Sequence, residues 1–375
     1  MRVLHLIDSG GMYGAENVLL NLLVGLKKAG HTPLLGSIRL PGEPKKQIEV
    51  AVESLGIEVW PVTARRGFDR SAARLLAKRA RTEQVSVIHC HGYKANILTA
   101  LFARSVFRGA IVTTLHGWTA TRISQPRWWY GLLDRQLLRF FDAIAAVQPG
   151  MLLDTRIPLG VRRRLVQIDN GIDTSPNEPS APPADLLTFC QQGETIGVVG
   201  RLSAEKGVDV LLDAFALLAT NRTAPRVAII GDGPLRSALE SKADALGIRS
   251  RVCFAGFVSA ATAVLPALKC LAIPSHTEGL PMVLLEAMRA QVPIVATRVG
   301  GIPTALQDGA CGYLVAPNDP RQLSEALLSA LDNDSETSSR VVAAFKRLHE
   351  RYSAQAMVDR YLNLYSTARK QREQR

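Results

Sequence analysis

The stretch SHTEGLPMVLLEAMRAQVPIVATRVGG, residues 275–301, places two glutamates eight positions apart, one in a loop bounded by Gly and Pro. The apolar runs 270–273 and 294–297 on either side predict buried strands. Between them the sequence predicts a helix that ends before Gln291, because Pro281 is typical of a first helical position and Met, Leu, Glu and Ala follow it. The stretch is therefore a predicted strand–helix–strand unit.

Both glutamates of this unit occupy positions that suit a nucleotide sugar. Glu278 follows the first strand, and ligands of open α/β sheets bind at the carboxyl ends of strands. The helix start behind Gly279 offers backbone N–H groups to an anion, while carboxylates such as Glu278 and Glu286 accept hydrogen bonds from sugar and ribose hydroxyls. Two glutamates taken alone fit a solvated loop and a helix surface better, so the rest of the chain must decide.

The composition indicates a two-domain α/β protein. The chain has 375 residues, enough for two cores, and 47% of them are hydrophobic. No apolar run approaches the length of a membrane span, and the chain enters a predicted strand at once, so we expect a cytoplasmic protein. Five scattered cysteines predict core thiols rather than disulfides or a zinc site. They are Cys90, Cys190, Cys253, Cys270 and Cys311.

The net charge of +12, from 45 Lys and Arg against 33 Asp and Glu, fits either an anionic partner or a generally basic surface. A helix predicted over 71–83 turns Ala72, Leu75, Leu76 and Ala80 to the core. This arrangement leaves outward a basic patch that consists of Arg70, Arg74, Lys78 and Arg81. We find no nucleic-acid recognition motif, so no nucleic-acid partner is expected. Anionic lipid is favoured, and Trp128, Trp129 and Tyr130 are candidates for further interfacial anchoring.

Residues 1–174 predict one doubly wound domain. Its first strand leads into a glycine turn and a helix, which together make a phosphate cradle without the Lys-Ser/Thr of a P-loop; the turn reads Asp8-Ser-Gly-Gly-Met-Tyr-Gly-Ala-Glu16. His89-Cys-His91 resembles a metal cluster, but Cys90 faces the other side of the strand and no third ligand follows at a useful spacing, so no metal is expected. His116 follows strand 111–115 and is placed to reach a ligand in an interdomain cleft.

A Pro- and Ser-rich linker over 175–183 precedes a second α/β alternation. The first strand of this half runs into Gly200-Arg-Leu-Ser-Ala-Glu-Lys-Gly207, where Arg201 and Lys206 are suited to hold a diphosphate. Gly231-Asp-Gly-Pro234 repeats the strand–turn–helix arrangement. Asp332-Asn-Asp334 matches the Asp-x-Asp metal motif of some sugar transferases, but its place between two late helices predicts a helix stop and N-cap.

The order of GGxxGAE, HG, GRLxxxKG, GxGP and Glu-x7-Glu across the two halves resembles the family-4 retaining glycosyltransferases of the GT-B fold. The resemblance covers essentially the whole chain. It implies two Rossmann-like, doubly wound domains that face a central cleft, with C-terminal helices crossing back. The implied parts are an acceptor-binding domain at 1–174, the linker at 175–183, a nucleotide-sugar domain at 184–352 and a terminal helix at 353–375 that packs on the first domain.

The resemblance also implies residue roles. Arg201 and Lys206, beside Gly200, would hold the diphosphate, and Glu286 would bind the ribose. Glu278 would orient the donor sugar and His116 would contact it. The backbone would contribute at Gly11, which lets the chain approach the diphosphate or acceptor, and around the donor sugar at Gly279, Leu280, Pro281 and Met282.

The implied reaction moves a hexosyl unit from a nucleoside diphosphate sugar to an acceptor hydroxyl with retention. Side-chain cations and a helix N-terminus would stabilise the departing diphosphate, so neither a metal nor a cofactor is expected. The implied setting is bacterial exopolysaccharide, lipopolysaccharide or glycolipid assembly. Together with the basic patch, it predicts a lipid-linked acceptor at the inner face of the membrane. A nucleotide-sugar epimerase of the same fold, which needs acid/base groups we do not identify, and a non-catalytic sugar-nucleotide-binding protein remain as alternatives.

Overall fold

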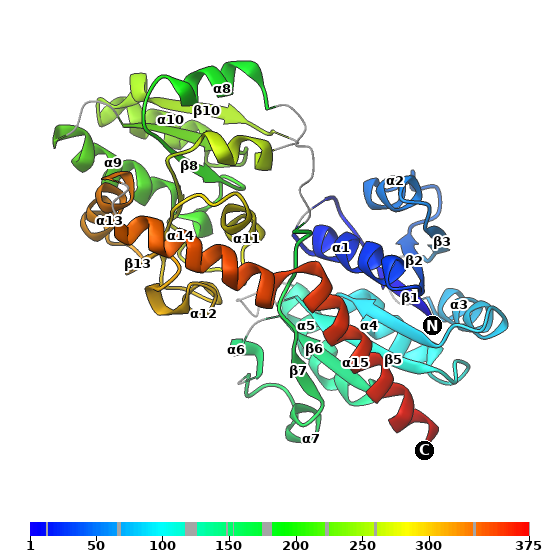
Figure 1. The fold of residues 1–375 in the computed structure, drawn as a ribbon. Coiled ribbons are helices and arrows are strands. Elements are labelled where there is room, and N and C mark those ends of the chain that lie inside the picture. The colour runs from blue at the N-terminus through cyan, green and yellow to red at the C-terminus, as the bar shows by residue number, and fades with distance from the viewer. Residues whose placement is uncertain are drawn as a thin grey trace. The chain divides into compact units, whose positions relative to one another are not determined.

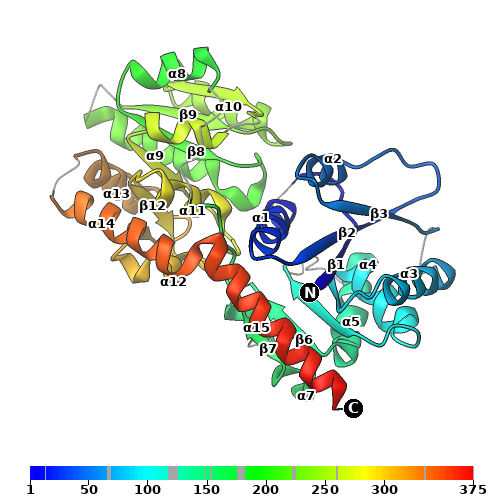
Figure 2. The ribbon, with the colours of Figure 1, turned by 45° about the vertical axis from the view of Figure 1, so that its right-hand side comes forward.

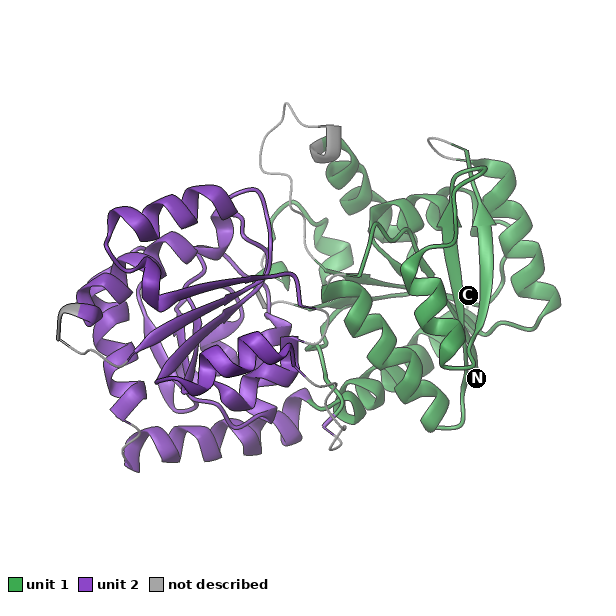
Figure 3. Cartoon of the chain, turned by 90° about the horizontal axis from the view of Figure 1, so that it is seen from above, with its two compact units in different colours: residues 1–173, 353–375 green, residues 174–352 purple. Residues whose placement is uncertain are grey.

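The computed structural model describes residues 1–12, 14–65, 69–116, 126–147, 149–152, 154–174, 182–221, 225–258, 261–332 and 335–374. These residues form two compact units, coloured separately in Figure 3. Unit 1 is Met1–Asp173 together with Ser353–Arg375, and unit 2 is Thr174–Tyr352. Most of the proposed linker, residues 175–181, lies outside the described part.

Unit 1 contains a seven-stranded parallel sheet in the order β3-β2-β1-β4-β5-β6-β7. Its central strands are buried along their whole length, as expected for a parallel sheet with helices on both faces. The order reverses between β1 and β4, where doubly wound sheets bind ligands. The strands are β1 (Arg2–Ile7), β2 (Thr32–Arg39), β3 (Glu58–Thr63), β4 (Val87–His91), β5 (Ala110–Leu115), β6 (Ala143–Ala146) and β7 (Leu165–Gln167).

The helices of unit 1 cover this sheet (Figure 1). They are α1 (Gly14–Lys28), α2 (Gln47–Ser54), α3 (Arg70–Thr82), α4 (Tyr93–Leu98), α5 (Pro126–Leu137), α6 (Pro149–Leu152), α7 (Leu159–Arg162) and the terminal α15 (Ala354–Glu373). Ser353 caps α15 by accepting a hydrogen bond from the N–H of Ala356 at 3.2 Å. The helix then packs on α1, β5 and β6. Figure 2 shows it running alongside β6. A Cβ on Gly25 of α1 would lie 2.4 Å from Val358, so glycine permits this close approach.

Helix α3 differs from the prediction in the phase of its buried face. Asp69 caps the helix, and Ala73, Leu76, Ala77 and Ala80 face the core. Leu75, which was assigned to the core, is instead 71% exposed. Three of the four buried residues of α3 are alanines. A prediction that gives most weight to leucine therefore assigns the wrong buried face. The four residues of the basic patch are exposed as predicted.

Unit 2 contains a six-stranded parallel sheet in the order β10-β9-β8-β11-β12-β13, which repeats the doubly wound topology. Its strands are β8 (Thr195–Val199), β9 (Arg226–Ile230), β10 (Val252–Gly256), β11 (Cys270–Ile273), β12 (Ile294–Thr297) and β13 (Tyr313–Val315). Its helices are α8 (Ala184–Gln191), α9 (Val208–Asn221), α10 (Arg236–Ala245), α11 (Met282–Arg289), α12 (Ile302–Ala305), α13 (Pro320–Asp332) and α14 (Ser335–Arg347). The predicted pair of Rossmann-like sheets is confirmed.

The five cysteines are free thiols, four of them buried, and burial raises the pKa of each. Within the described ranges, no helix is both long and apolar enough to cross a bilayer. Of the Asp-x-Asp candidate, only Asp332 is described, and it is the last residue of α13. Asn333 and Asp334 lie outside the described residues.

Candidate active site

The predicted loops of unit 2 meet where its strand order reverses. β8 and β11 are neighbours in the sheet, so the loops that follow them leave the same edge side by side. A recess opens there, lined by side chains from both loops and from the start of α11. Its lining includes Gly200, Arg201, Lys206, Ser275, Glu278 and Val283. This edge is the expected ligand site of such a sheet.

An ion pair joins the two loops across the recess. Lys206 Nζ lies 2.6 Å from Glu278 Oε1, and the buried Ser275 hydroxyl donates to the same carboxylate oxygen at 2.8 Å. The side chains of Glu278 and Lys206 are 10% and 28% exposed, so both are largely shielded from solvent. Arg201 is exposed at its rim. A cation and a carboxylate are thus held ready for an anionic group and for hydroxyls.

Backbone contacts fix the two loops against each other. The N–H of His276 donates to the carbonyl of Glu205 at 2.9 Å and so joins the two loops. Thr297 Oγ1, at the end of β12, donates to the carbonyl of Ser275 at 2.6 Å and holds the second loop to the sheet. Gly207 has φ +60, and a Cβ there would lie 2.1 Å from the carbonyl oxygen of Pro274. The GRLxxxKG motif therefore ends in glycine because no side chain fits against the strand beneath it.

Helix α11 supplies the predicted free N-terminus. The helix begins at Met282, one residue later than predicted, so Pro281 precedes the helix instead of opening it. Pro281 takes an extended conformation and gives no side-chain cap, which leaves the first N–H groups of α11 for a ligand. The N–H of Gly301 donates to the carbonyl of Gly279 at 2.7 Å and so anchors the approach to the helix.

Glu286 lies on α11, one turn beyond its start, and is half-buried. Burial raises the pKa of its carboxyl group above the ordinary value, and the nearby Arg289 opposes that rise. A partly desolvated carboxylate gains more than an exposed one from hydrogen-bond donors on a ligand.

The predicted site residues of unit 1 lie elsewhere in the chain. Gly11 belongs to a turn after β1, where its N–H donates to Ser9 Oγ at 3.3 Å. His116 directly follows β5, and its Nε2 lies 3.2 Å from Nδ1 of His91. Residues 117–125, including the glycine of the HG motif, lie outside the described part.

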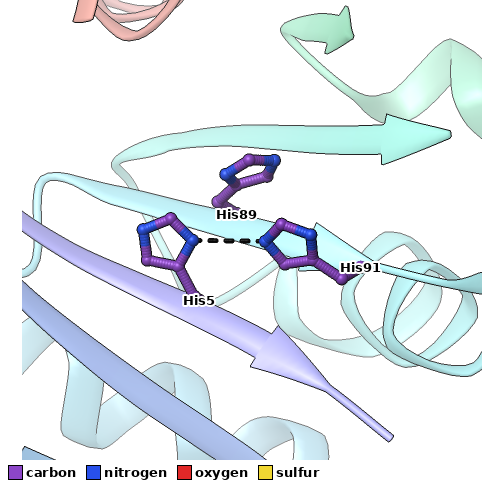
Figure 4. A group of neighbouring side chains, drawn as sticks. All are labelled: His5, His89 and His91. Carbon is purple, nitrogen blue, oxygen red and sulfur yellow. Dashed lines mark hydrogen bonds between the residues drawn. The ribbon is translucent and has the colours of Figure 1, made fainter. Parts of the chain in front are cut away.

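The interpretation of His89-Cys-His91 needs a correction. Cys90 does face away, but a third histidine is present: His5 of β1 pairs in register with His89, and the three rings cluster in the sheet (Figure 4). The sequence could not reveal this neighbour because it depends on β1 pairing with β4.

The sequence also missed two lysines near Gly11. Lys46 and Lys94 Nζ lie 2.8 and 2.9 Å from the carboxylate oxygens of Asp8, at the point where the strand order of unit 1 reverses. Although burial opposes it, their charge holds the pKa of Asp8 below its usual value. The sequence could have indicated this site through Asp8, a charged residue directly after a predicted strand.

Comparison with known proteins identifies the family. Residues 12–176 match the description Glycosyltransferase Family 4, and residues 188–347 match Glycosyl transferases group 1. The chain belongs to glycosyltransferase family 4. The expected family and GT-B fold are thus confirmed, and this enzyme transfers a sugar from a nucleotide sugar.

Several relatives of this family-4 glycosyltransferase have known names. It is 26% identical over 330 residues to an N-acetyl-alpha-D-glucosaminyl L-malate synthase of Bacillus anthracis, covering 84% of this chain and 82% of that protein. It is 29% identical over 249 residues to the O-antigen chain mannosyltransferase C of Escherichia coli, covering 64% of each. The crystal structure of Anabaena HepE in complex with UDP superposes with a TM-score of 0.82 at 21% identity, covering 98% of this chain and all of that one.

Replacing Gly300 with alanine should disrupt the Glu278 loop of the glycosyltransferase. Gly300 has φ +55, and a Cβ there would lie 1.9 Å from the carbonyl oxygen of Glu278. We expect unit 2 to lose about 3 kcal/mol or more, from the left-handed backbone and the overlap together. Gly247 is the matched control, since it has φ +69 with nothing within 4 Å of a Cβ, so alanine there should cost only about 1–2 kcal/mol. Urea unfolding followed by circular dichroism measures both, and equal losses would contradict the predicted overlap.

Proposed function

We propose that this enzyme transfers a hexosyl unit, with retention, from a UDP-sugar bound in the recess of unit 2. The single observation that carries the proposal is the Lys206–Glu278 pair at 2.6 Å, at the edge of the sheet where its strand order reverses. The free N-terminus of α11 lies beside it. UDP is chosen because the solved structures with this fold include HepE with UDP and with UDP-glucose.

Each side chain of the recess has a distinct role in this proposal. Lys206 acts as a point charge on the diphosphate, and the exposed Arg201 binds it through the fork of its guanidinium. As the bond to the sugar breaks, negative charge grows on the departing diphosphate, and both cations and the α11 N-terminus stabilise it. Glu278 accepts hydrogen bonds from sugar hydroxyls and orients the anomeric carbon.

We further propose that no divalent metal takes part, since two side-chain cations and a helix N-terminus supply positive charge at the diphosphate. Incubation with UDP-sugars, followed by detection of UDP and of the sugar product, tests the reaction. Release of UDP that survives a chelator supports a metal-independent transferase. Conversion of one UDP-sugar into its epimer favours the epimerase, and binding without turnover favours the non-catalytic alternative.

Ribose binding by Glu286 should depend on pH. An ionised carboxylate accepts bonds from both ribose hydroxyls, so binding favours the charged form, whereas burial raises the pKa of Glu286 in the free protein above 4.5. Affinity for uridine, which has no phosphate to titrate, should therefore weaken as the pH falls toward the raised pKa of Glu286.

NMR titration at several pH values measures this dependence. Glu286→Gln should bind more weakly and lose the pH dependence. Glu240→Gln is the control, because Glu240 is also half-buried in unit 2 but pairs with Arg236 at 3.1 Å on α10. An unchanged pH profile in Glu286→Gln would remove Glu286 from the ribose site.

We also propose a lipid-linked acceptor of a cell-envelope glycan and peripheral attachment through the basic patch. Among the described residues, Arg70, Arg74, Lys78 and Arg81 form no ion pair, and the exposed Leu75 lies among them. Arg79 is different, since it lies 3.5 Å from Glu58. On α5, Trp129 is 59% exposed, and Tyr130 stacks on Tyr93 at 5.6 Å between ring centroids. The side chain of Trp128 is outside the described part.

Vesicle flotation in low salt should show binding to anionic vesicles, because each basic residue near such a surface contributes about 1 kcal/mol. Reversal of Arg70, Arg74 and Lys78 to Glu should abolish binding, and added salt should weaken it. The control reverses three exposed cations elsewhere to Glu, at Arg298, Lys346 and Arg369. It has the same net charge as the first variant and should keep much of the binding. Equal loss in both variants would show that only overall charge matters.

A further inference from the structure

One face of the unit 1 sheet carries polar side chains on three adjacent strands. His5 of β1, His89 and His91 of β4, and Thr114 of β5 are buried there, and His116 follows β5 on the same side. Helix α15 covers this face with two buried tyrosines, Tyr361 and Tyr365. Buried polar groups need partners, so the hydrogen bonds of this cluster reveal its organisation.

The cluster divides into two hydrogen-bonded sets. In the first, His89 bonds to the Tyr365 hydroxyl through Nδ1 at 2.8 Å and to Thr114 Oγ1 through Nε2 at 2.7 Å. In the second, His5 Nδ1 lies 3.2 Å from His91 Nε2, and His91 Nδ1 lies 3.2 Å from His116 Nε2. The second set is a chain of three rings that begins at a buried end, His5, and terminates at His116, the residue expected from the family resemblance to contact the sugar.

The buried end sets the direction of this chain. A neutral imidazole has one N–H and one lone pair, so all three rings must point their protons the same way. His5 Nε2 is buried and has no hydrogen-bond partner among the described residues. A buried N–H group without an acceptor is rarer in proteins than a buried acceptor without a donor. The proton of His5 therefore belongs on Nδ1, where it is donated to His91, and His91 in turn donates from Nδ1 to His116.

We propose that His5 and His91 are positioning residues that hold His116 with its proton on Nδ1, as a neutral hydrogen-bond donor toward the ligand. With Nε2 of His116 occupied as an acceptor, its remaining ring nitrogen must carry the hydrogen. The proposal rests on the proposed contact between His116 and the transferred sugar. It specifies which atom of His116 makes that contact and that the atom donates to a sugar oxygen.

Burial keeps the chain uncharged. It lowers the pKa of His116 to about 4 and that of His5 to about 3, and it holds the pKa of His91 well below its usual value. At neutral pH His116 is thus a neutral donor rather than an imidazolium acid.

A metal ion fits the same histidines less well. The ligand atoms of His5, His89 and His91 lie within 4.8 Å of one another. However, both nitrogens of His89 and both of His91 already have partners, and these are a tyrosine, a threonine and other histidines rather than carboxylates. A metal would have to displace these hydrogen bonds before His89 and His91 could act as ligands.

The proton position can be read by NMR of the full-length protein labelled with ¹⁵N in histidine, because protonated and bare ring nitrogens have different shifts. We expect His116 to carry its proton on Nδ1. His91→Leu should give a mixed or Nε2-protonated His116 and lower kcat/KM by about tenfold, the scale of one hydrogen bond. His91→Asn places an amide N–H near the position of Nδ1 and should restore both. Tyr365→Phe, which removes a bond to His89 only, should leave the His116 signal unchanged.

The outcomes separate this inference from the proposed function. A proton on Nε2 of His116 in the unmodified protein, or an unchanged His116 signal in His91→Leu, overturns the inference. Stoichiometric zinc that His91→Leu abolishes overturns it in favour of a metal site. If His116→Ala leaves turnover unchanged while the NMR results hold, the sugar contact fails but the ordered chain stands.

Discussion

Lys206→Ala is expected to lower kcat/KM by about 30- to 1000-fold, which corresponds to about 2–4 kcal/mol of lost transition-state stabilisation. The lysine lies 2.6 Å from Glu278 and is only 28% exposed, so its charge acts in a partly water-excluded recess. Without it, the departing diphosphate loses a preorganised cation and Glu278 keeps only the hydrogen bond from Ser275. Steady-state kinetics with a UDP-sugar measures the effect, and most of the loss should fall on kcat.

Lys242→Ala is the matched control for this prediction. Lys242 also belongs to unit 2, is 30% exposed and pairs with a carboxylate, Asp213, at 2.6 Å. Its removal should leave kcat/KM within about twofold, because exposed ion pairs away from a site contribute little. A similar loss in both variants would mean that Lys206 acts through stability. An increase in KM alone would mean that it holds substrate and transition state equally.

The loops of the recess could be predicted because short-range signals define them. Gly200 and Lys206 lie in the turn that follows the buried strand β8. Pro281 marks the start of α11 to within one residue. Their meeting follows from topology, since strands that flank the reversal of a doubly wound sheet are neighbours.

Other features depend on contacts between distant segments, which a pattern of residues does not encode. His5 and His91 are 86 positions apart, and only the register of β1 against β4 brings their rings together. Tyr365 meets His89 because the C-terminal helix returns to unit 1, 276 positions later. The misplacement of Leu75 has another cause, since alanines define the buried face of α3 and their hydrophobic signal is weak.

Unit 1 should lose stability steeply as the pH falls below about 6.5. Burial keeps four histidines neutral in the folded state, with the pKa of His5 lowered to about 3, that of His116 to about 4, and those of His89 and His91 well below their usual value. The unfolded chain takes up these protons near pH 6.5, so their contribution is present above that pH and is lost as the pH falls. Each histidine contributes at most about 1.4 kcal/mol per pH unit.

When all four contribute, the free energy of unfolding should fall by about 5 kcal/mol per pH unit below pH 6, a large share of the usual 5–15 kcal/mol of a domain. All four tryptophans of the chain, Trp60, Trp118, Trp128 and Trp129, belong to unit 1. Urea unfolding followed by tryptophan fluorescence therefore reports on unit 1 alone. Between pH 6.5 and 5 the carboxyl groups with lowered pKa, such as Asp8, are still ionised and do not confuse the result.

His5→Leu isolates one proton of this effect. The substitution removes a ring whose Nε2 has no partner among the described residues, and its loss should reduce the pH slope by about a quarter, or about 1.4 kcal/mol per pH unit. His31→Leu is the comparison, since His31 lies outside the cluster, beside the N-terminal amine at 3.0 Å, and is only half-buried. Burial and the N-terminal charge also lower the pKa of His31, but less than burial lowers that of His5, so its loss should reduce the slope over a narrower pH range. A free energy of unfolding that stays level from pH 7 to pH 5 would mean that the cluster protonates in place, and the rings of His5, His89 and His91 would then be accessible to water rather than buried.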